Sequence, residues 1–154
     1  MASLSRRGVL LSVGLGLLLV AASADAERSW RLPRKVPGYS VSLEDGFGAR
    51  LPTYQHEGRT FVLGERGERY SIRVENPTGE RLEAVVSVDG RDAVSGRPGN
   101  YRTQRGYIVP AYGSIVIEGF RRSLDEVATF RYSDPEASYS ARLGTPENVG
   151  VIGV

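Results

Sequence analysis

The sequence contains no cysteine and only one histidine in 154 residues. Without cysteine, a disulfide framework, a thiolate metal site and a cysteine nucleophile are all excluded. A zinc site normally takes three or four His, Cys or carboxylate ligands, so the lone His56 argues against one. No Gly-x-Ser-x-Gly motif occurs, and any serine–histidine pair would have to use His56. We therefore expect no metal and no cofactor, and we favour a non-catalytic protein.

A large excess of one charge is also missing. The chain carries 20 basic and 18 acidic residues, a net charge of +2, and the two signs are interspersed. The only basic run is "RSWRLPRK", residues 28–35. Because nucleic-acid binding needs a clustered basic face, we do not expect a nucleic-acid partner.

The one long apolar run lies near the N-terminus. Arg6 and Arg7 precede "VLLSVGLGLLLVAA", and small residues follow up to Ala26. This order is typical of a secretory signal peptide over residues 1–26, and the run of about 14 residues is shorter than the ~20 that a spanning helix needs. We expect a periplasmic or secreted protein with no transmembrane segment after cleavage. "SRRGVLL" is also similar to a twin-arginine signal, so export in the unfolded or the folded state stays open.

The remainder of the chain divides into a short linker and one domain. Residues 27–38 are rich in Arg and Pro, lack any periodicity and contain the only tryptophan, Trp30. Residues 39–154 have the length of a single domain. We expect the linker to end where the first alternating pattern begins.

A period of two dominates this domain. Apolar and polar residues alternate in Tyr39–Leu43, Tyr70–Val74, Leu82–Val88 and Ala128–Tyr132, with Val85 as an exception. Alternation predicts strands with one buried face. Roughly seven to eight short strands separated by turn residues predict an all-β, antiparallel immunoglobulin-like β-sandwich, with a small β-barrel as the alternative.

Local signals predict several connections. "NPTG", Asn76–Gly79, has the residues of a type I turn and predicts a hairpin between Tyr70–Val74 and Leu82–Val88. The segments Ser123–Val127 and Ser138–Leu143 each predict a short helical turn. "NVGVIGV" at the C-terminus predicts a central, buried last strand, and the alternative is an edge strand that adds to a partner's sheet.

The stretch "VVSVDGRDAVSG", residues 85–96, allows two interpretations. Asp89 and Asp92 could hold a metal, but they are three residues apart, with Arg91 between them, unlike the alternate ligands of a calcium loop. Asp-Gly after an alternating strand is typical of a type I′ hairpin turn. We expect a turn at Asp89-Gly90, with Asp92 accepting hydrogen bonds from nearby backbone N–H groups.

The best candidate for ligand binding is the segment Arg97–Gly113. Tyrosine and arginine together supply contact area and polar groups for recognising a protein or a sugar. The candidate residues are Tyr101, Arg102, Arg105, Tyr107 and Tyr112. The alternative is that Tyr107 points into the core and the arginines are merely solvated.

Several phrases in order carry a resemblance: "HEGRTFV", "RYSIRVENPTGERLEAVVSVDG", "RGYI", "IEGFRRS", "VATFRYS", "SYSAR" and "NVGVIGV". They resemble a family of uncharacterised bacterial exported or surface-associated proteins over roughly Tyr54 to Val154. Relatives tend to carry an apolar residue where this chain has Arg91. The resemblance implies one exported β domain and supplies no activity, substrate or catalytic residue.

Three hypotheses for the function follow. The first is an exported, non-catalytic binding or envelope-accessory module whose partner is an envelope protein or glycan. The second is a hydrolase-like enzyme using carboxylates near His56 or Asp89. The third is an assembly subunit that uses its C-terminal strand as an edge. The oligomeric state is not determined by these patterns.

Overall fold

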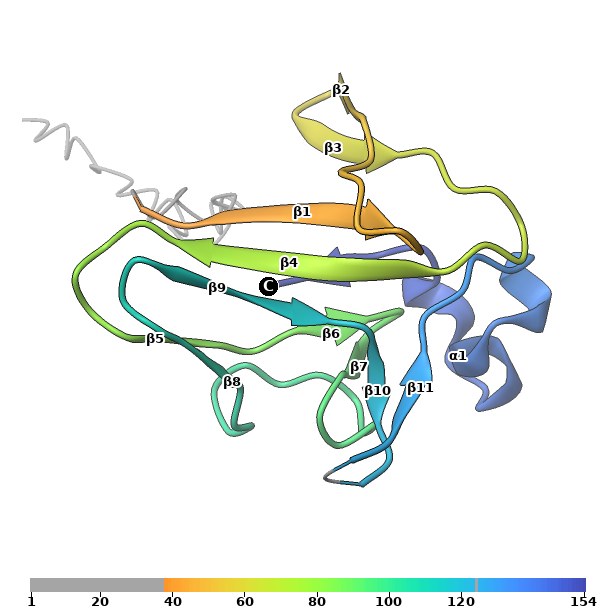
Figure 1. Ribbon diagram of the computed structural model, residues 1–154. Helices are drawn as coiled ribbons and strands as arrows, with labels where there is room; N and C mark the ends of the chain where they lie inside the picture. The colour runs from red at the N-terminus through yellow and green to blue at the C-terminus, as the bar shows by residue number, and fades with distance from the viewer. Residues whose placement is uncertain (1–37, 124) are drawn as a thin grey trace, which may run out of the picture. The chain divides into compact units, whose positions relative to one another are not determined.

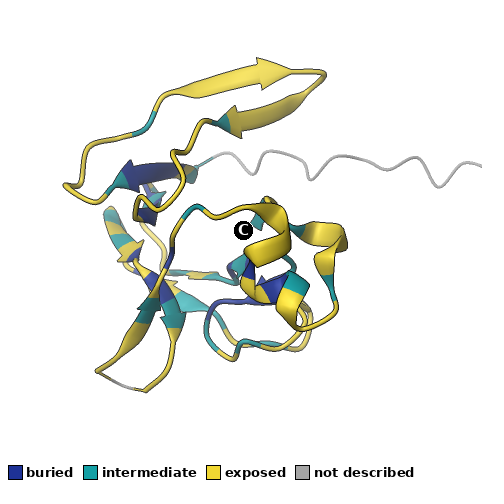
Figure 2. Ribbon diagram, turned by 90° about the vertical axis from the view of Figure 1, so that its right-hand side faces the viewer, coloured by how far each residue is buried: buried dark blue, intermediate teal, exposed yellow. Residues whose placement is uncertain are grey.

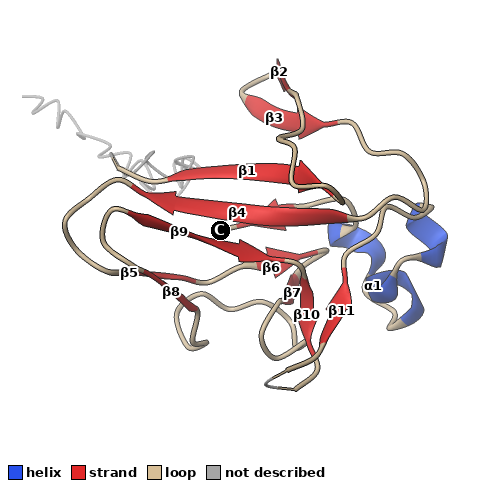
Figure 3. Ribbon diagram, in the orientation of Figure 1, coloured by secondary structure: helices blue, strands red, loops and turns tan. Residues whose placement is uncertain are grey.

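The computed structural model describes residues 38–123 and 125–154 (Figure 1). The predicted signal peptide, residues 1–26, lies outside the described residues, as does all of the predicted linker except Gly38, including Trp30. The described part consists mostly of short antiparallel strands, with three short helical segments near the C-terminus (Figure 3). The all-β antiparallel class is therefore confirmed. In this part of the chain, no helix has the length and apolar character needed to cross a bilayer.

The longest ladder has the order β1-β4-β9. Its strands are β1 (Ser40–Asp45), β4 (Tyr70–Asn76) and β9 (Gly113–Ile117). β4 lies between the other two strands. Its residue Ile72 pairs with Leu43 of β1 on one side and with Ile117 of β9 on the other. Ile72 and Val74 are almost fully buried, and so is Asn76 at the end of the strand. The predicted period of two thus correctly located the most buried strand.

Four smaller ladders complete the structure. Their strands are β2 (Thr53–His56) with β3 (Arg59–Val62); β5 (Leu82–Ala84) with β8 (Tyr107–Val109); β10 (Gly119–Arg121) with β11 (Val127–Thr129); and β12 (Ile152–Gly153), β6 (Ser87–Val88) and β7 (Arg91–Asp92), in the order β12-β6-β7. The helical segments are η1 (Pro135–Ala137), α1 (Tyr139–Arg142) and η2 (Pro146–Asn148). None of the ladders among the described strands closes into a barrel.

The predicted hairpin between Tyr70–Val74 and Leu82–Val88 is wrong. β4 pairs with β1 and β9, whereas β5 pairs with β8. The buried Asn76 explains the difference, because its Nδ2 donates to the carbonyl oxygens of Glu80 (2.6 Å) and Pro110 (3.0 Å). Its Oδ1 accepts the backbone N–H of Thr78. These bonds hold residues 76–80 as a crossover between two ladders.

The predicted strand Leu82–Val88 is divided at Val85. Its first part pairs as β5 and its second as β6, and Val86 between them is fully buried. The apolar core contains side chains from the β1-β4-β9 ladder and from the smaller ladders. Its buried residues are Leu43, Tyr70, Ile72, Val74, Val86, Val88, Ala93, Val109, Ile117 and Phe130. One core is therefore shared between the β1-β4-β9 ladder and the shorter ladders.

The predicted turn at Asp89-Gly90 is confirmed. Both residues have positive φ, 53° and 76°, and Val88 pairs with Arg91 across the turn. Asp92 also acts as predicted, because its Oδ2 accepts the backbone N–H of Ser95 (2.8 Å) and the Ser95 hydroxyl. The stretch is a hairpin, and the Asp92 carboxylate stabilises the segment that follows it by bonding to Ser95.

The C-terminal strand is an edge strand, so the prediction of a central strand is wrong. β12 is the outermost member of β12-β6-β7. Asp89 fixes it in place: the Asp89 N–H donates to the carbonyl of Val151 (2.9 Å), and its Oδ1 accepts the N–H of Gly150 (2.8 Å). Gly150 has φ of 81°, a conformation that favours glycine.

The two predicted helical turns differ in outcome. Ser138 caps α1 as expected, its Oγ accepting the N–H of Ala141 at 3.1 Å. Ser123 instead lies in the loop of the β10–β11 hairpin, where its Oγ accepts the N–H groups of Asp125 and Glu126. Its hydroxyl stabilises a hairpin loop by the same local bonding that would cap a helix.

The β2–β3 hairpin stands apart from the other ladders in its exposure. Seven of its eight strand residues are exposed and the eighth, Val62, is half-buried (Figure 2). Tyr54 pairs with Phe61, and His56 pairs with Arg59. The hairpin therefore presents both of its faces to solvent.

Candidate functional site

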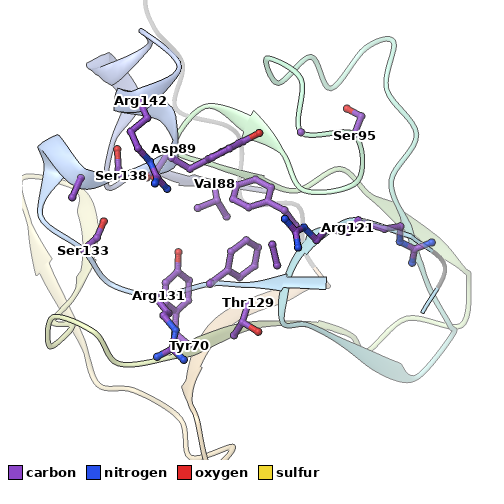
Figure 4. Close-up of a pocket in the computed structure, with 17 residues that line it drawn as sticks. Tyr70, Val88, Asp89, Ser95, Arg121, Thr129, Arg131, Ser133, Ser138 and Arg142 are labelled. Atoms are coloured by element: carbon purple, nitrogen blue, oxygen red, sulfur yellow. The ribbon is translucent and has the colours of Figure 1, made fainter. Parts of the chain in front are cut away.

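A cavity lies between the β10–β11 hairpin and the η1–α1 segment, beside the β6–β7 turn (Figure 4). Its volume is about 530 Å³. Residues from five separate stretches line it: Tyr70; Val88 and Asp89; Ser95 and Gly96; Phe120–Arg122; and, in 128–142, Ala128–Arg131, Ser133, Ala137–Tyr139 and Arg142. We call this cavity the arginine pocket, for the side chains described below.

A chain of aromatic rings runs along the arginine pocket. Tyr139 and Phe120 have ring centroids 5.7 Å apart, Phe120 meets Phe130 edge-on at 5.2 Å, and Phe130 stacks on Tyr70 at 5.3 Å. Phe130 and Tyr70 are buried in the core, whereas 46% of Tyr139 is exposed. The rings thus fix the floor to the core and leave aromatic surface at the mouth.

Four arginines line the pocket: Arg121, Arg122, Arg131 and Arg142. All four are exposed, and none takes part in an ion pair among the described residues. The Arg131 Nη1 donates to the carbonyl of Gly67 (2.7 Å), which positions that guanidinium. Of the described residues in the lining, Asp89 is the only carboxylate, and its Oδ1 already accepts the N–H of Gly150. The pocket therefore has an excess of positive charge.

A fifth arginine lies buried against the lining. Arg91 is 8% exposed, and its two terminal nitrogens donate to the carbonyl of Gly96 (3.1 Å) and the hydroxyl of Thr145 (2.9 Å). Its guanidinium carbon lies 5.7 Å from the ring centroid of Tyr139. Its Nε has no hydrogen-bond partner, and no carboxylate of the described residues pairs with it. A buried charge without a counter-ion is costly, and it adds positive potential near Tyr139.

Burial alters the acid–base behaviour of two nearby tyrosines. Burial, followed by the charge of Asp89, raises the pKa of Tyr70 well above its ordinary value. Burial also raises the pKa of Tyr107, where Arg121 acts in the opposite direction and Asp92 adds to the rise. Both phenols therefore stay protonated to a higher pH than an exposed tyrosine does.

The structure does not gather the five predicted ligand-binding residues. Tyr101, Arg102, Arg105 and Tyr112 are exposed, and none of the five lines the arginine pocket. The Arg102 Nε donates to the Tyr101 hydroxyl (3.1 Å), so these two form a local pair. Tyr107 is half-buried against the core, and Arg121 lies 5.7 Å from its ring centroid. Only Tyr107 thus connects the predicted segment to the pocket.

His56 and Asp89 do not form one site. His56 lies on the exposed β2–β3 hairpin, whereas Asp89 lines the pocket. His56 Nε2 approaches Glu57 Oε1 to 3.8 Å, because Glu57 does not continue the strand but occupies the turn, with φ of 47°. Both side chains are well exposed to solvent. Among the described residues, no cluster of three or more His, Asp or Glu is arranged to hold a metal ion.

Sequence reasoning missed the arginines and aromatic residues of the pocket. The signal was present in "GFRRS", where Phe120 precedes Arg121 and Arg122, and in "SYSAR", which contains Tyr139 and Arg142. The two phrases are separated along the chain, so only the packing of α1 beside β10 brings them together. No protein-family model, curated protein or solved structure matches this chain.

Proposed function

We propose that the chain is an exported, non-catalytic binding module of the cell envelope, and that the arginine pocket holds its ligand. The observation that carries this proposal is the combination of four arginines, which form no ion pair with another described residue, and partly exposed aromatic rings around one cavity. A cavity of about 530 Å³ falls within the range of ligand sites. The predicted signal peptide and the resemblance to exported proteins support the location.

The proposed scaffold is an immunoglobulin-like sandwich. One layer is β1-β4-β9, and the other combines the β5–β8 pair with β12-β6-β7. The apolar cluster supports this arrangement, because it draws on Ile72 and Val74 from the first group and on Val88 and Val109 from the second. Such a scaffold would hold the pocket as a largely preformed site.

The composition of the pocket favours binding over hydrolysis. Most glycoside hydrolases need two carboxyl groups on opposite sides of the scissile bond. The lining supplies only Asp89, and Asp89 is tied to the C-terminal strand through Gly150. His56, the other proposed catalytic residue, is not part of the lining.

The test is retention of an envelope component by the purified exported protein. Envelope glycan and envelope protein fractions are passed over three immobilised forms: wild type, the pocket variant Arg121→Gln/Arg142→Gln, and the variant Tyr101→Ala/Arg102→Gln. We expect wild type and the second variant to retain a glycan component that the pocket variant loses.

Two outcomes would contradict the proposal. Loss of retention only in the Tyr101/Arg102 variant would move the site to the tyrosine–arginine segment. Release of new reducing ends from the glycan fraction by wild type, but not by Asp89→Asn, would favour the hydrolase hypothesis.

A second candidate function is assembly through the C-terminal strand. β12 is the outermost strand of its ladder, so one of its edges has no partner among the described strands. Exposed strand edges are templates for pairing with another chain. Sedimentation velocity over a wide concentration range tests this candidate. A constant monomer mass rejects self-assembly, and a rising mass that Ile152→Pro abolishes supports it.

A further inference from the structure

We infer that the ligand of the arginine pocket is an acidic saccharide, a sugar unit carrying a carboxylate or phosphate group. This inference rests on the proposed function and adds the chemical class of the ligand. Three features carry it: the charge of the lining, the placement of the arginines, and the combination of aromatic rings with accessible hydroxyls.

The charge of the lining selects an anion. Arg121, Arg122, Arg131 and Arg142 face a single carboxylate, and the buried Arg91 lies behind Tyr139 and Gly96 without a counter-ion. A guanidinium is planar and always charged, and it binds carboxylate and phosphate through two parallel hydrogen bonds. An anion in the pocket would offset a positive potential that the described residues leave largely uncompensated.

The arginines are spread over the pocket rather than clustered at one point. Arg121 comes from β10, Arg131 follows β11, and Arg142 belongs to α1. Figure 4 shows these three side chains on different sides of the cavity. A free inorganic anion could engage only one side, so this placement favours a larger ligand that presents its acidic group while its body occupies the cavity.

The body of the ligand meets aromatic rings and hydroxyls. Tyr139 offers exposed ring surface, and Phe120 beside it is half-buried. Thr129 and Ser133 also line the cavity, and both residues are exposed, so their hydroxyls are accessible to a ligand. A sugar ring has an apolar C–H face for the aromatic rings and hydroxyls for the polar groups, so it matches both kinds of surface.

A neighbouring hollow provides an internal contrast. It shares Tyr70 and Thr129 with the arginine pocket, but its charged lining residues are three carboxylates and one arginine: Glu44, which pairs with Arg73, Asp45, Glu118 and Arg69. Arginines thus outnumber carboxylates on one side of the shared residues, and carboxylates outnumber arginines on the other. An anionic ligand is directed to the arginine pocket by this separation.

The experiment measures binding of matched saccharides to the exported protein by calorimetry. An oligogalacturonate is compared with its methyl ester, which keeps the sugar backbone and removes the charge. A mannose phosphate is compared with mannose to test the phosphate source. We expect one acidic probe to bind at least tenfold more tightly than its neutral counterpart, and the difference to shrink as salt is added.

Two pocket variants are expected to move the affinity in opposite directions. Arg142→Gln should weaken the acidic probe about tenfold or more, because it removes a charge-assisted contact. Asp89→Asn should strengthen binding several-fold, because it removes the only carboxylate while Asn still tolerates the positive φ and can accept the Gly150 N–H. Arg59→Gln on the β2–β3 hairpin is the matched control and should leave the affinity unchanged. Unchanged melting temperatures exclude unfolding as the cause.

The outcomes separate this inference from the proposed function. If neutral and acidic probes bind equally, or if neither acidic probe binds, the inference is overturned. The proposed function still stands in that case if the pocket variant loses the retained envelope component. If a single-stranded DNA oligomer binds more tightly than every saccharide, the pocket serves a nucleic acid and the inference is also overturned.

Discussion

Two hairpins of this protein use the same turn in opposite surroundings. Glu57-Gly58 in β2–β3 and Asp89-Gly90 in β6–β7 are both two-residue turns with positive φ at each position. Around the second turn, Arg91 and Asp92 are buried, and Asp89 is bonded through its N–H, carbonyl and carboxylate. Around the first, the strands are exposed.

The two hairpins share the geometry of their turns but differ in the packing around them. The dipeptide Xaa-Gly suffices to form the turn in both places, because the flanking strands need that twist. What differs is the number of other elements that depend on each turn. Ser140 of α1 and the residues just before β12, Gly150 and Val151, bond to Asp89. A Cβ at Gly58, in contrast, would meet no other atom of the described residues within 4 Å. Equal substitutions should therefore have unequal effects.

The largest difference is expected for the two turn glycines. Both have similar φ, 73° at Gly58 and 76° at Gly90, but a Cβ at Gly90 would lie 2.9 Å from the Asn148 Cβ, whereas Gly58 faces open space. Gly58→Ala should lower the free energy of unfolding by about 1–2 kcal/mol through backbone strain alone. Gly90→Ala should cost about 2–4 kcal/mol, because the contact with Asn148 is added. Urea denaturation measures both, and equal losses would refute the distinction.

The next difference concerns a polar side chain in each hairpin. Asp92 is 1% exposed and holds Ser95 through two bonds, whereas the exposed Gln55 bonds to the Thr60 hydroxyl across β2–β3. Asp92→Ala should cost about 2 kcal/mol, and Gln55→Ala about 0.5 kcal/mol or less. Asp92→Asn keeps an acceptor oxygen and should lose less than the alanine variant. Thermal unfolding gives the order, and a larger loss for Gln55→Ala would reverse the comparison.

A smaller difference is expected for the first residue of each turn. Asp89→Ala removes the carboxylate that accepts the Gly150 N–H, at a cost of about 1 kcal/mol. Glu57→Ala should change the stability by less than about 0.5 kcal/mol. Hydrogen exchange locates the effect: the amides of residues 150–152 should exchange faster in Asp89→Ala only. Unchanged protection there would show that the carboxylate does not secure β12.

The smallest effect is expected for the exposed aromatic pair of β2–β3. Tyr54 and Phe61 face each other across the hairpin, and such pairs contribute roughly 0.2–1 kcal/mol. Phe61→Ala should therefore loosen the hairpin while leaving the melting temperature of the core nearly unchanged. Backbone NMR shifts and thermal unfolding report the two parts separately. A large drop in melting temperature would mean that the hairpin is part of the core.

The sequence predicted the local elements better than their pairing. Alternation located β1 and β4, and Asp-Gly located the β6–β7 turn, because both depend on neighbours in the chain. The predicted pairing after Asn76 failed, because its side-chain amide reaches Pro110, which lies 34 residues away. No local pattern encodes that contact.

The candidate site was the least predictable part. The residues of the tyrosine–arginine segment are close in sequence, but only Tyr107 approaches the arginine pocket, through Arg121. The pocket combines β10, β11 and α1 with the β6–β7 turn. Its arginines are therefore brought together around one cavity only when the chain folds. Arg91 illustrates this limit, because the sequence placed its charge in a loop, whereas the fold buries it against Tyr139.

The pairing of β12 with β6 also determines the order in which parts of the structure can form. Val88 is synthesised long before its partner Ile152. Asp89 is likewise synthesised before Gly150, which lies 61 residues later in the chain. The β6–β7 hairpin therefore cannot gain its edge strand, and the arginine pocket cannot gain Tyr139 and Arg142, before these later residues have been made. The proposed ligand binding at this pocket therefore requires that residues 139–142 have been made and packed beside β10.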